Sequence, residues 1–151
     1  MNTKALLVVD VQEEYIERYE DGLLKRINQR IEKAAENNEL IIYIKNIKTL
    51  RNKEKTSPLA EELYIASTYV FNKKKSSAFS NNELVKFIKE NEVANIEIIG
   101  VDGNFCVSST AKEGKKIFQN ITVNCDGIGT LNGQRFEKTK ETLNELGVEI
   151  R

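Results

Sequence analysis

Residues 96–111 read Ile-Glu-Ile-Ile-Gly-Val-Asp-Gly-Asn-Phe-Cys-Val-Ser-Ser-Thr-Ala. The stretch opens with a strand-like run at 96–99, and apolar residues between 107 and 118 recur at helical spacing. Cys106 is therefore expected where a buried strand gives way to a helix. The first N–H groups of a helix have no intrahelical partners and carry partial positive charge, which favours thiolate over thiol. This position makes Cys106 a candidate nucleophile.

Position alone leaves a plainer role open for Cys106, because free cysteine is often buried and usually packs as a small hydrophobe. The second cysteine, Cys125, ends an expected strand, and we interpret it as structural. Two cysteines do not make a disulfide framework, and they suit a reducing compartment. The chain has no histidine, which removes Ser-His-Asp and Cys-His catalysis and every zinc site that needs imidazole.

Apolar runs typical of buried strands alternate along the chain with segments of helical periodicity. Six segments read as strands: 5–9, 40–44, 68–71, 96–99, 121–123 and 148–150. Helices are expected around 23–34, 84–88, 107–118 and 136–146, the second behind the cap candidates Asn81 and Asn82 and the last ending at Gly147. This alternation predicts an α/β fold with a parallel sheet.

Composition limits the classes of partner. A chain of 151 residues suits one domain, 1–151, with a single core. Lysine plus arginine number 23, and so do aspartate plus glutamate. The chain therefore lacks the excess of basic charge that would indicate binding to nucleic acid. No apolar run is long enough to span a bilayer, and residues 1–4 lead into a strand without a signal-peptide pattern. We expect a cytoplasmic protein whose partners are small molecules or proteins, with no nucleic acid and no membrane.

Three polar residues follow expected strands, and ligands of an open parallel sheet bind beyond the carboxyl ends of its strands. Asp10 follows the first strand, Lys73 the third and Cys106 the fourth. Lys73 would stabilise a thiolate at Cys106, and Asp10 would take the thiol proton during attack, without any histidine. Each alone has a structural reading: an aspartate can cap a turn, and residues 73–75 can be a solvated lysine run. Their joint placement favours chemistry.

Two other segments invite a functional reading. Residues 46–56 are rich in lysine, arginine and asparagine, and Pro58 follows at an expected helix start. We interpret 46–56 as a solvated loop, with a lid or rim over a ligand site as the alternative. Gly127, Gly129 and Gly133 faintly suggest a dinucleotide-binding loop, but too little chain follows them. A glycine-rich turn into the last helix is the better interpretation.

Three blocks of this sequence, in this order and spacing, resemble the isochorismatase-like cysteine hydrolases. They are Leu6-Leu7-Val8-Val9-Asp10-Val11-Gln12-Glu13-Glu14-Tyr15, then Lys73 with Ser77-Ala78-Phe79, then Gly100-Val101-Asp102-Gly103-Asn104-Phe105-Cys106-Val107. The resemblance runs nearly from end to end. It implies a flavodoxin-like, three-layer αβα fold with a mostly parallel six-stranded sheet.

The resemblance also implies an activity. Family members that keep an Asp-Lys-Cys triad cleave amide or related C–N bonds through a covalent thioester, and the matching residues are Asp10, Lys73 and Cys106. Lys73 is chosen among three lysines because the family's lysine stands six residues before the phenylalanine at Phe79. A cis peptide at Val101-Asp102 is implied, with the backbone N–H groups of Asp102 and Cys106 as an oxyanion hole.

The remaining expectations concern the pocket and its partners. Gln12 and Tyr15 are expected to line the substrate pocket, and no cofactor is expected. Family members commonly form oligomers, so we expect a homodimer or a homotetramer. An activated Cys106 should be alkylated by iodoacetamide at mildly acidic pH, much faster than Cys125.

The sequence departs from two activities of the family. Its nicotinamidases hold a metal with aspartate and histidines after the second strand, where this chain has Tyr43-Ile44-Lys45-Asn46-Ile47, so we assign no metal site. Isochorismatase proper lacks the nucleophilic cysteine. The region between the second and third strands is also short for the family, which leaves the substrate open. The alternative is a protein of the same fold that binds a small molecule or partner without turnover.

Overall fold

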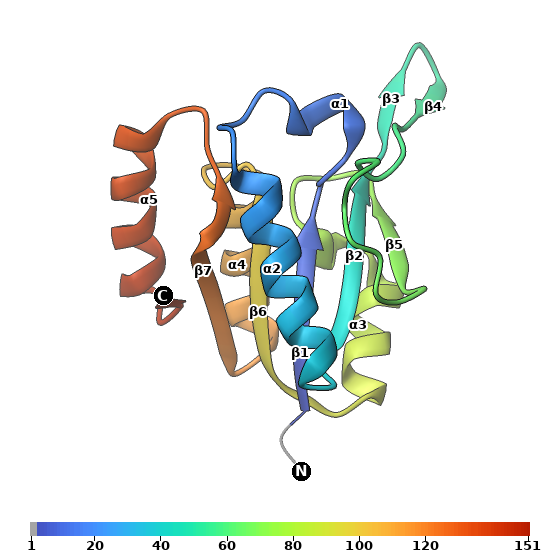
Figure 1. The fold of residues 1–151 in the computed structure, drawn as a ribbon. Coiled ribbons are helices and arrows are strands. Elements are labelled where there is room, and N and C mark those ends of the chain that lie inside the picture. Colours follow the sequence, from blue (N-terminus) through green and yellow to red (C-terminus); the bar gives the residue numbers. More distant parts are fainter. Residues whose placement is uncertain (1–2) are drawn as a thin grey trace.

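A six-stranded sheet forms the centre of the computed structural model, which describes residues 3–151 (Figure 1). Its order is β5-β2-β1-β6-β7-β8, and all five pairings are parallel. The strands are β1 (Thr3–Val9), β2 (Leu40–Asn46), β5 (Val70–Lys73), β6 (Val93–Val101), β7 (Asn120–Gly129) and β8 (Glu149–Ile150). The predicted α/β fold with a six-stranded parallel sheet is confirmed. Met1 and Asn2, part of the expected domain 1–151, lie outside the described residues.

Helices cover both faces of the sheet and complete the three layers. Successive strand residues point to opposite faces, so the buried strands feed two separate cores. One core lies under α2 (Leu23–Glu36), and the other lies under α3 (Asn82–Glu90), α4 (Cys106–Ile117) and α5 (Gly133–Glu145). No helix within residues 3–151 combines the length and apolar character needed to cross a membrane.

Local signals set several helix ends as expected. Asn81 caps α3, because its side chain accepts hydrogen bonds from the N–H groups of Glu83 and Leu84. Helix α5 ends just before Gly147, whose φ of 95° suits glycine. Two short helices, α1 (Glu13–Ile16) and the 3-10 helix η1 (Ala78–Ser80), were not expected. Both lie in segments that follow a strand.

The segment from residue 46 to residue 60 differs from its prediction in two ways. Residues 46–56 hold a hairpin, not only a loop: β3 (Lys48–Leu50) pairs antiparallel with β4 (Lys53–Lys55) through a two-residue turn with positive φ. Its strands are exposed on both sides, so they lack the alternation that marks a half-buried strand. Pro58 does not start a helix; its carbonyl instead accepts the N–H of Glu13 at the start of α1.

The predicted glycine-rich turn into the last helix is wrong for two of its three glycines. Gly127 and Gly129 lie within β7, and only Gly133, the first residue of α5, lies where the last helix begins. Gly100 has a stricter role. Its φ is 125°, and a Cβ there would lie 2.1 Å from the carbonyl oxygen of Val9. Glycine is therefore required for β6 to pass the end of β1 this closely, and this close approach lies beside the candidate site.

Candidate active site

The candidate site lies where the strand order reverses. The chain moves from β1 to β2 on one side and later returns to β6 on the other side of β1. Open parallel sheets leave a crevice at such a point, beyond the carboxyl ends of the strands. Asp10 directly follows β1, Lys73 is the last residue of β5, and Cys106 is the first residue of α4.

The structure brings these three side chains together around the Lys73 ammonium. Lys73 Nζ lies 3.1 Å from Asp10 Oδ2 and 3.2 Å from Cys106 Sγ. Asp10 and Lys73 are only 4% and 2% exposed, whereas Cys106 is half-buried. A buried ammonium thus contacts the carboxylate and the thiol at once. This is the juxtaposition that the strand ends predicted.

Two further groups accept hydrogen bonds from Lys73, and one of them, Asn46, was not predicted from the sequence. Its Nζ donates to Asn46 Oδ1 at 2.9 Å and to the carbonyl oxygen of Lys75 at 3.2 Å. Lys74 points away from the site and pairs with Glu54, and the Lys75 side chain is exposed. The choice of Lys73 among the three lysines therefore agrees with the geometry. Asn46, the last residue of β2, is a fourth member of the cluster.

Burial sets the resting protonation state of the site. Burial raises the pKa of the Asp10 carboxyl above its ordinary 3.8, although the nearby Lys73 opposes the change. Burial and the Asp10 charge raise the pKa of the Cys106 thiol above its ordinary 9.0, and Lys73 only partly offsets them. Cys106 is therefore a thiol at neutral pH, beside an Asp10–Lys73 ion pair. The expectation of a thiolate poised at mildly acidic pH does not fit this resting state.

Net charge explains how the site can still produce a nucleophile. Thiol, carboxylate and ammonium sum to zero, and so do thiolate, carboxylic acid and ammonium. Moving the proton from Cys106 to Asp10 creates no net buried charge, because Lys73 lies within 3.2 Å of both partners. Asp10 Oδ1 is buried and lacks a hydrogen-bond partner among residues 3–151, so it is free to accept that proton.

The turn from β6 to α4 is held by the Asp102 carboxylate. The peptide bond between Val101 and Asp102 is cis. The Asp102 side chain accepts the N–H groups of Asn104 at 2.8 Å and Leu131 at 3.1 Å, and the Tyr19 hydroxyl at 3.2 Å. Burial and this carboxylate raise the pKa of Tyr19, so its hydroxyl stays protonated and acts as the hydrogen-bond donor to Asp102. Tyr19 was not foreseen, since it lies 83 residues from Asp102 in sequence.

The oxyanion-hole expectation concerns backbone amides at this turn. Cys106 is the first residue of α4, where a helical N–H has no intrahelical acceptor. The Asp102 N–H has no hydrogen-bond acceptor within residues 3–151. Within residues 3–151, both amides thus lack an acceptor. Their binding of an oxyanion stays a prediction.

Gln12 and Tyr15 both support Asn46. Gln12 is fully buried, its Nε2 donates to the Ser57 carbonyl at 2.9 Å, and its Oε1 accepts the Asn46 N–H at 2.8 Å. Tyr15 is half-buried, and its hydroxyl accepts a hydrogen bond from Asn46 Nδ2 at 3.1 Å. Gln12 therefore lies behind Asn46, not at an open surface. Direct contact of either residue with a substrate stays a prediction.

Comparison with known proteins places the chain in a family. The family profile described as "Isochorismatase domain" matches residues 4–150. The chain belongs to the isochorismatase family. A search of curated protein sequences found no significant match for this isochorismatase-family chain.

Solved structures share the fold of this family member over nearly their whole length. A pyrazinamidase from Pyrococcus horikoshii, solved in complex with zinc, has a TM-score of 0.84 and 20% identity, with 98% of each chain covered. A nicotinamidase from Staphylococcus aureus has a TM-score of 0.82 and 23% identity, with 100% of this chain and 99% of its own chain covered. An N-carbamoylsarcosine amidase from Thermoplasma acidophilum has a TM-score of 0.82 and 18% identity, with 99% of this chain and 95% of its own chain covered. These similarities establish the fold.

The family member described here does not offer the donor set that zinc prefers. Zinc is bound by cysteine sulfur, histidine nitrogen or carboxylate oxygen. No group of three such side chains within residues 3–151 is placed so that it could hold a metal ion. The end of β2 supplies the neutral Asn46, whose amide is engaged by Lys73 and Tyr15, with Lys45 as its neighbour. The residues present therefore do not fit a zinc ion.

Asn46→Ala tests whether Asn46 holds Lys73. The change removes one acceptor from a buried ammonium, and hydrogen bonds to charged groups contribute about 1.5–3 kcal/mol each. We expect the free energy of unfolding, measured by urea denaturation, to fall by that amount. Asn72→Ala, a change of the same chemistry at an exposed site on β5, is the matched control and should change it by less than about 0.5 kcal/mol. Equal effects would show that Asn46 gives Lys73 no special support.

Proposed function

We propose that this protein is a cysteine hydrolase that cleaves a C–N bond of a small amide or carbamoyl compound through a covalent thioester. One observation carries the proposal: a single buried ammonium, Lys73 Nζ, lies within 3.2 Å of both the Asp10 carboxylate and the Cys106 thiol. Family membership supports it, as do structural neighbours named for amidase activities. The chemistry needs no cofactor.

Acylation begins with proton transfer within the cluster. Asp10 takes the Cys106 proton as Sγ bonds to the carbonyl carbon of the substrate, and Lys73 then pairs with the developing thiolate. The carbonyl oxygen becomes an oxyanion, which the N–H groups of Asp102 and Cys106 stabilise. When the C–N bond breaks, Asp10 returns the proton to the leaving nitrogen. A thioester on Cys106 and a free amine or ammonia result.

Deacylation repeats the same steps with water. Asp10 takes a proton from water as its oxygen attacks the thioester carbonyl, and a second oxyanion forms in the same amides. The C–S bond then breaks, the acid product leaves, and the proton on Asp10 returns to Cys106 Sγ. The cluster keeps zero net charge in the resting protein and in the activated state, so the buried site never holds an unpaired charge.

The proposal is tested by trapping the thioester. The protein is mixed with a panel that includes pyrazinamide, nicotinamide, N-carbamoylsarcosine and simple aliphatic amides, quenched in acid and analysed by peptide mass spectrometry. We expect an acyl adduct on the Cys106 peptide with at least one compound, and none on Cys125. Cys106→Ala should show neither adduct nor release of amine or ammonia. No adduct and no release across the panel would favour a binding protein without turnover.

Alkylation checks the resting state of the thiol without any substrate. Because the pKa of Cys106 is raised above 9.0, we expect its reaction with iodoacetamide to accelerate with pH, with a midpoint above pH 9. The Cys125→Ala variant isolates the signal of Cys106. Rapid reaction already at pH 6 would show that the effect of Lys73 on the pKa of Cys106 outweighs the effects of burial and Asp10, contrary to the proposed resting thiol.

A further inference from the structure

The segment that follows Lys73 is fastened to the helix that carries the thiol. Residues 74–78 run from the end of β5 into η1, and the Lys75 carbonyl within them accepts a hydrogen bond from Lys73 Nζ at 3.2 Å. Residues 74–76 are exposed, so packing around them does little to hold this carbonyl in place. The position of the 74–78 segment therefore helps to set the position of the ammonium.

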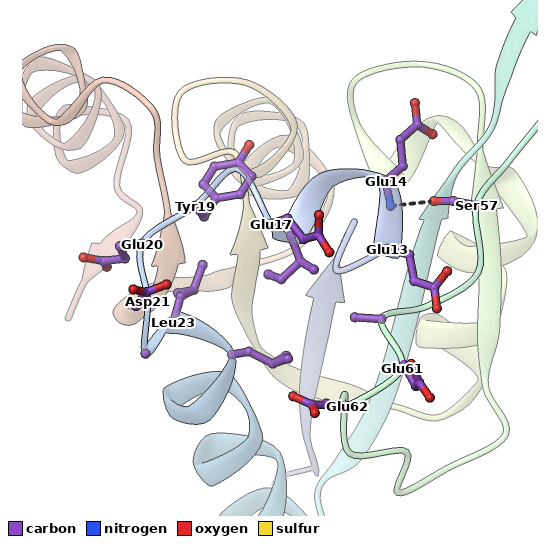
Figure 2. Close-up of a pocket in the computed structure, with 14 residues that line it drawn as sticks. Glu13, Glu14, Glu17, Tyr19, Glu20, Asp21, Leu23, Ser57, Glu61 and Glu62 are labelled. Carbon is purple, nitrogen blue, oxygen red and sulfur yellow. Dashed lines mark hydrogen bonds between the residues drawn. The ribbon is translucent and has the colours of Figure 1, made fainter.

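The Asn46 acceptor of Lys73, on the sheet side of the ammonium, has separate support. Gln12 accepts the Asn46 N–H at 2.8 Å and donates to the Ser57 carbonyl at 2.9 Å. Ser57 Oγ in turn accepts the N–H of Glu14 at 3.3 Å (Figure 2). These contacts involve no residue of the 74–78 segment, so the Lys75 carbonyl needs an anchor of its own.

Thr110 of α4 provides that anchor. Its Oγ1 accepts the N–H of Ala78 at 3.0 Å, and both residues are fully buried. A buried backbone N–H that loses its acceptor destabilises the arrangement around it, so this bond fixes the segment firmly. Thr110 lies four residues after Cys106, on the same face of the helix. One turn of α4 therefore carries both the thiol and the anchor of the segment.

Two further contacts join the segment and its continuation to α4. Ser76 Oγ donates to Ser109 Oγ at 2.8 Å. Phe79 packs directly on the helix backbone, since a Cβ at Gly114 would lie 2.7 Å from Phe79 Cε2. Gly114 lies one turn after Thr110, so the same face of α4 makes the contact. The segment is thus held to α4 at successive residues from 76 to 79.

We propose that Thr110, assisted by Ser109, is a positioning residue that holds Lys73 Nζ against Cys106 Sγ through the 74–78 segment. Thr110 is fully buried behind the segment and acts only through it. The expected effect on turnover rests on the proposed function, whereas the effect on the thiol does not.

The direction of the effect follows from the contact between ammonium and thiol. At 3.2 Å, Lys73 Nζ and Cys106 Sγ already touch, so a displaced ammonium can only move away from the sulfur. Burial and the Asp10 charge raise the pKa of Cys106, and Lys73 lowers it. These two residues are the charged groups that face the thiol. Loss of the anchor should therefore make the thiolate harder to form.

Thr110→Val tests the proposal through iodoacetamide labelling of Cys106 in a Cys125→Ala background. Valine removes the acceptor of the Ala78 N–H, so we expect the labelling midpoint to rise by at least about 0.5 pH and labelling at pH 8 to slow by about threefold. Thr110→Ser keeps the hydroxyl and should label at the wild-type rate. Thr122→Val on β7, which also loses one hydrogen bond, is the matched control and should do the same.

The sign of the change separates positioning from a general structural defect. Loosening of the structure would expose the half-buried thiol and make labelling faster, not slower. Labelling that is unchanged or faster in a folded Thr110→Val variant would overturn the proposal. If this variant does not fold, as circular dichroism would show, Ser109→Ala takes its place. It removes only the bond to Ser76, at a half-buried position, and should slow labelling by about twofold; an unchanged or faster rate would again overturn the proposal.

Turnover gives a second readout that distinguishes this proposal from the proposed function. With the compound that acylates the wild-type protein, Thr110→Val should lower kcat by about 10–100-fold and leave KM within about twofold, because Thr110 aligns the reacting groups without touching substrate. Slower labelling in a protein that turns over no compound would reject the hydrolase and support the positioning role. Turnover at the wild-type rate with unchanged labelling would keep the hydrolase and overturn the positioning role.

Discussion

Asp10→Asn will make Cys106 easier to alkylate and yet lower turnover by about 10²–10⁴-fold, the usual contribution of a general acid–base group. The two effects have opposite signs because Asp10 has two roles in the proposed mechanism. Its charge raises the pKa of the thiol, and its carboxyl carries the proton between sulfur and the leaving nitrogen. Asparagine removes the charge but cannot carry the proton.

The expected change in alkylation follows from the contacts of Lys73. Without the Asp10 charge, the ammonium 3.2 Å from Cys106 Sγ has only the thiolate as its anionic partner. An opposite charge at this distance lowers the pKa of an acid by roughly 1–3. The midpoint of iodoacetamide labelling should therefore move to lower pH by at least about 1. Turnover is measured as amine or ammonia release from the compound that acylates the wild-type protein.

Asp126→Asn, the same substitution at an exposed position, is the matched control and should leave labelling and turnover unchanged. A midpoint that stays in place or moves to higher pH would show that Asp10 does not oppose the thiolate. Turnover within about tenfold of the wild type would remove Asp10 from the mechanism. A loss of both labelling and turnover, together with a change in circular dichroism, would indicate a folding defect.

Much of the fold was predictable because buried parallel strands have a simple signature. Runs such as 5–9 and 40–44 are apolar without alternation, since both of their faces are covered by helices. The six strands of the central sheet and its four longer helices overlap the predicted segments, but β6 and β7 extend well beyond 96–99 and 121–123, and β5 is displaced by about two residues from 68–71. The hairpin at 48–55 was missed because its residues are exposed and charged, and it pairs only with itself.

The candidate site was predictable only in part. Parallel strands have their carboxyl ends at one edge of a sheet, so the residues that follow these ends are expected to lie close together. This rule predicted that Asp10, Lys73 and Cys106 share one site. Asn46 and Tyr19 were missed because their partners lie 27 and 83 residues away in sequence. One signal pointed to Asn46: it ends a strand adjacent to β1. The resting thiol was also missed, because burial is a property of the folded chain.

The second large effect concerns stability and involves Glu97, in the middle of β6. Its side chain is 1% exposed and is surrounded by cations: Lys4 Nζ at 2.9 Å, Arg30 Nε at 2.7 Å and Arg151 Nη1 at 3.6 Å. Asn124 Nδ2 donates to it at 3.1 Å. These partners hold the pKa of Glu97 below its ordinary 4.5, although burial alone would raise it. The ionised carboxylate joins β1, α2 and the carboxyl end of the chain.

Glu97→Gln is expected to lower the free energy of unfolding by about 3–5 kcal/mol at pH 7, because it removes one partner of a buried ion pair. Arg30 keeps Glu39 at 2.6 Å, but its Nη1 is already buried without a hydrogen-bond partner within residues 3–151. Lys4 and Arg151 are partly exposed and can turn to water. The cost therefore falls mainly on Arg30. Urea denaturation measures it, with the exposed Glu149→Gln as matched control, expected to change it by less than about 0.5 kcal/mol.

The dependence on pH gives this prediction a signature that a packing defect lacks. A carboxylate whose pKa is lower in the folded state contributes stability above its unfolded pKa and loses it as pH falls through the folded pKa. The difference between wild type and Glu97→Gln should therefore be full above about pH 4.5 and shrink progressively at lower pH, as Glu97 becomes protonated. A difference that stays constant with pH would mean that the glutamine disturbs packing only. In that case the charge of Glu97 would not be what joins β6 to its neighbours.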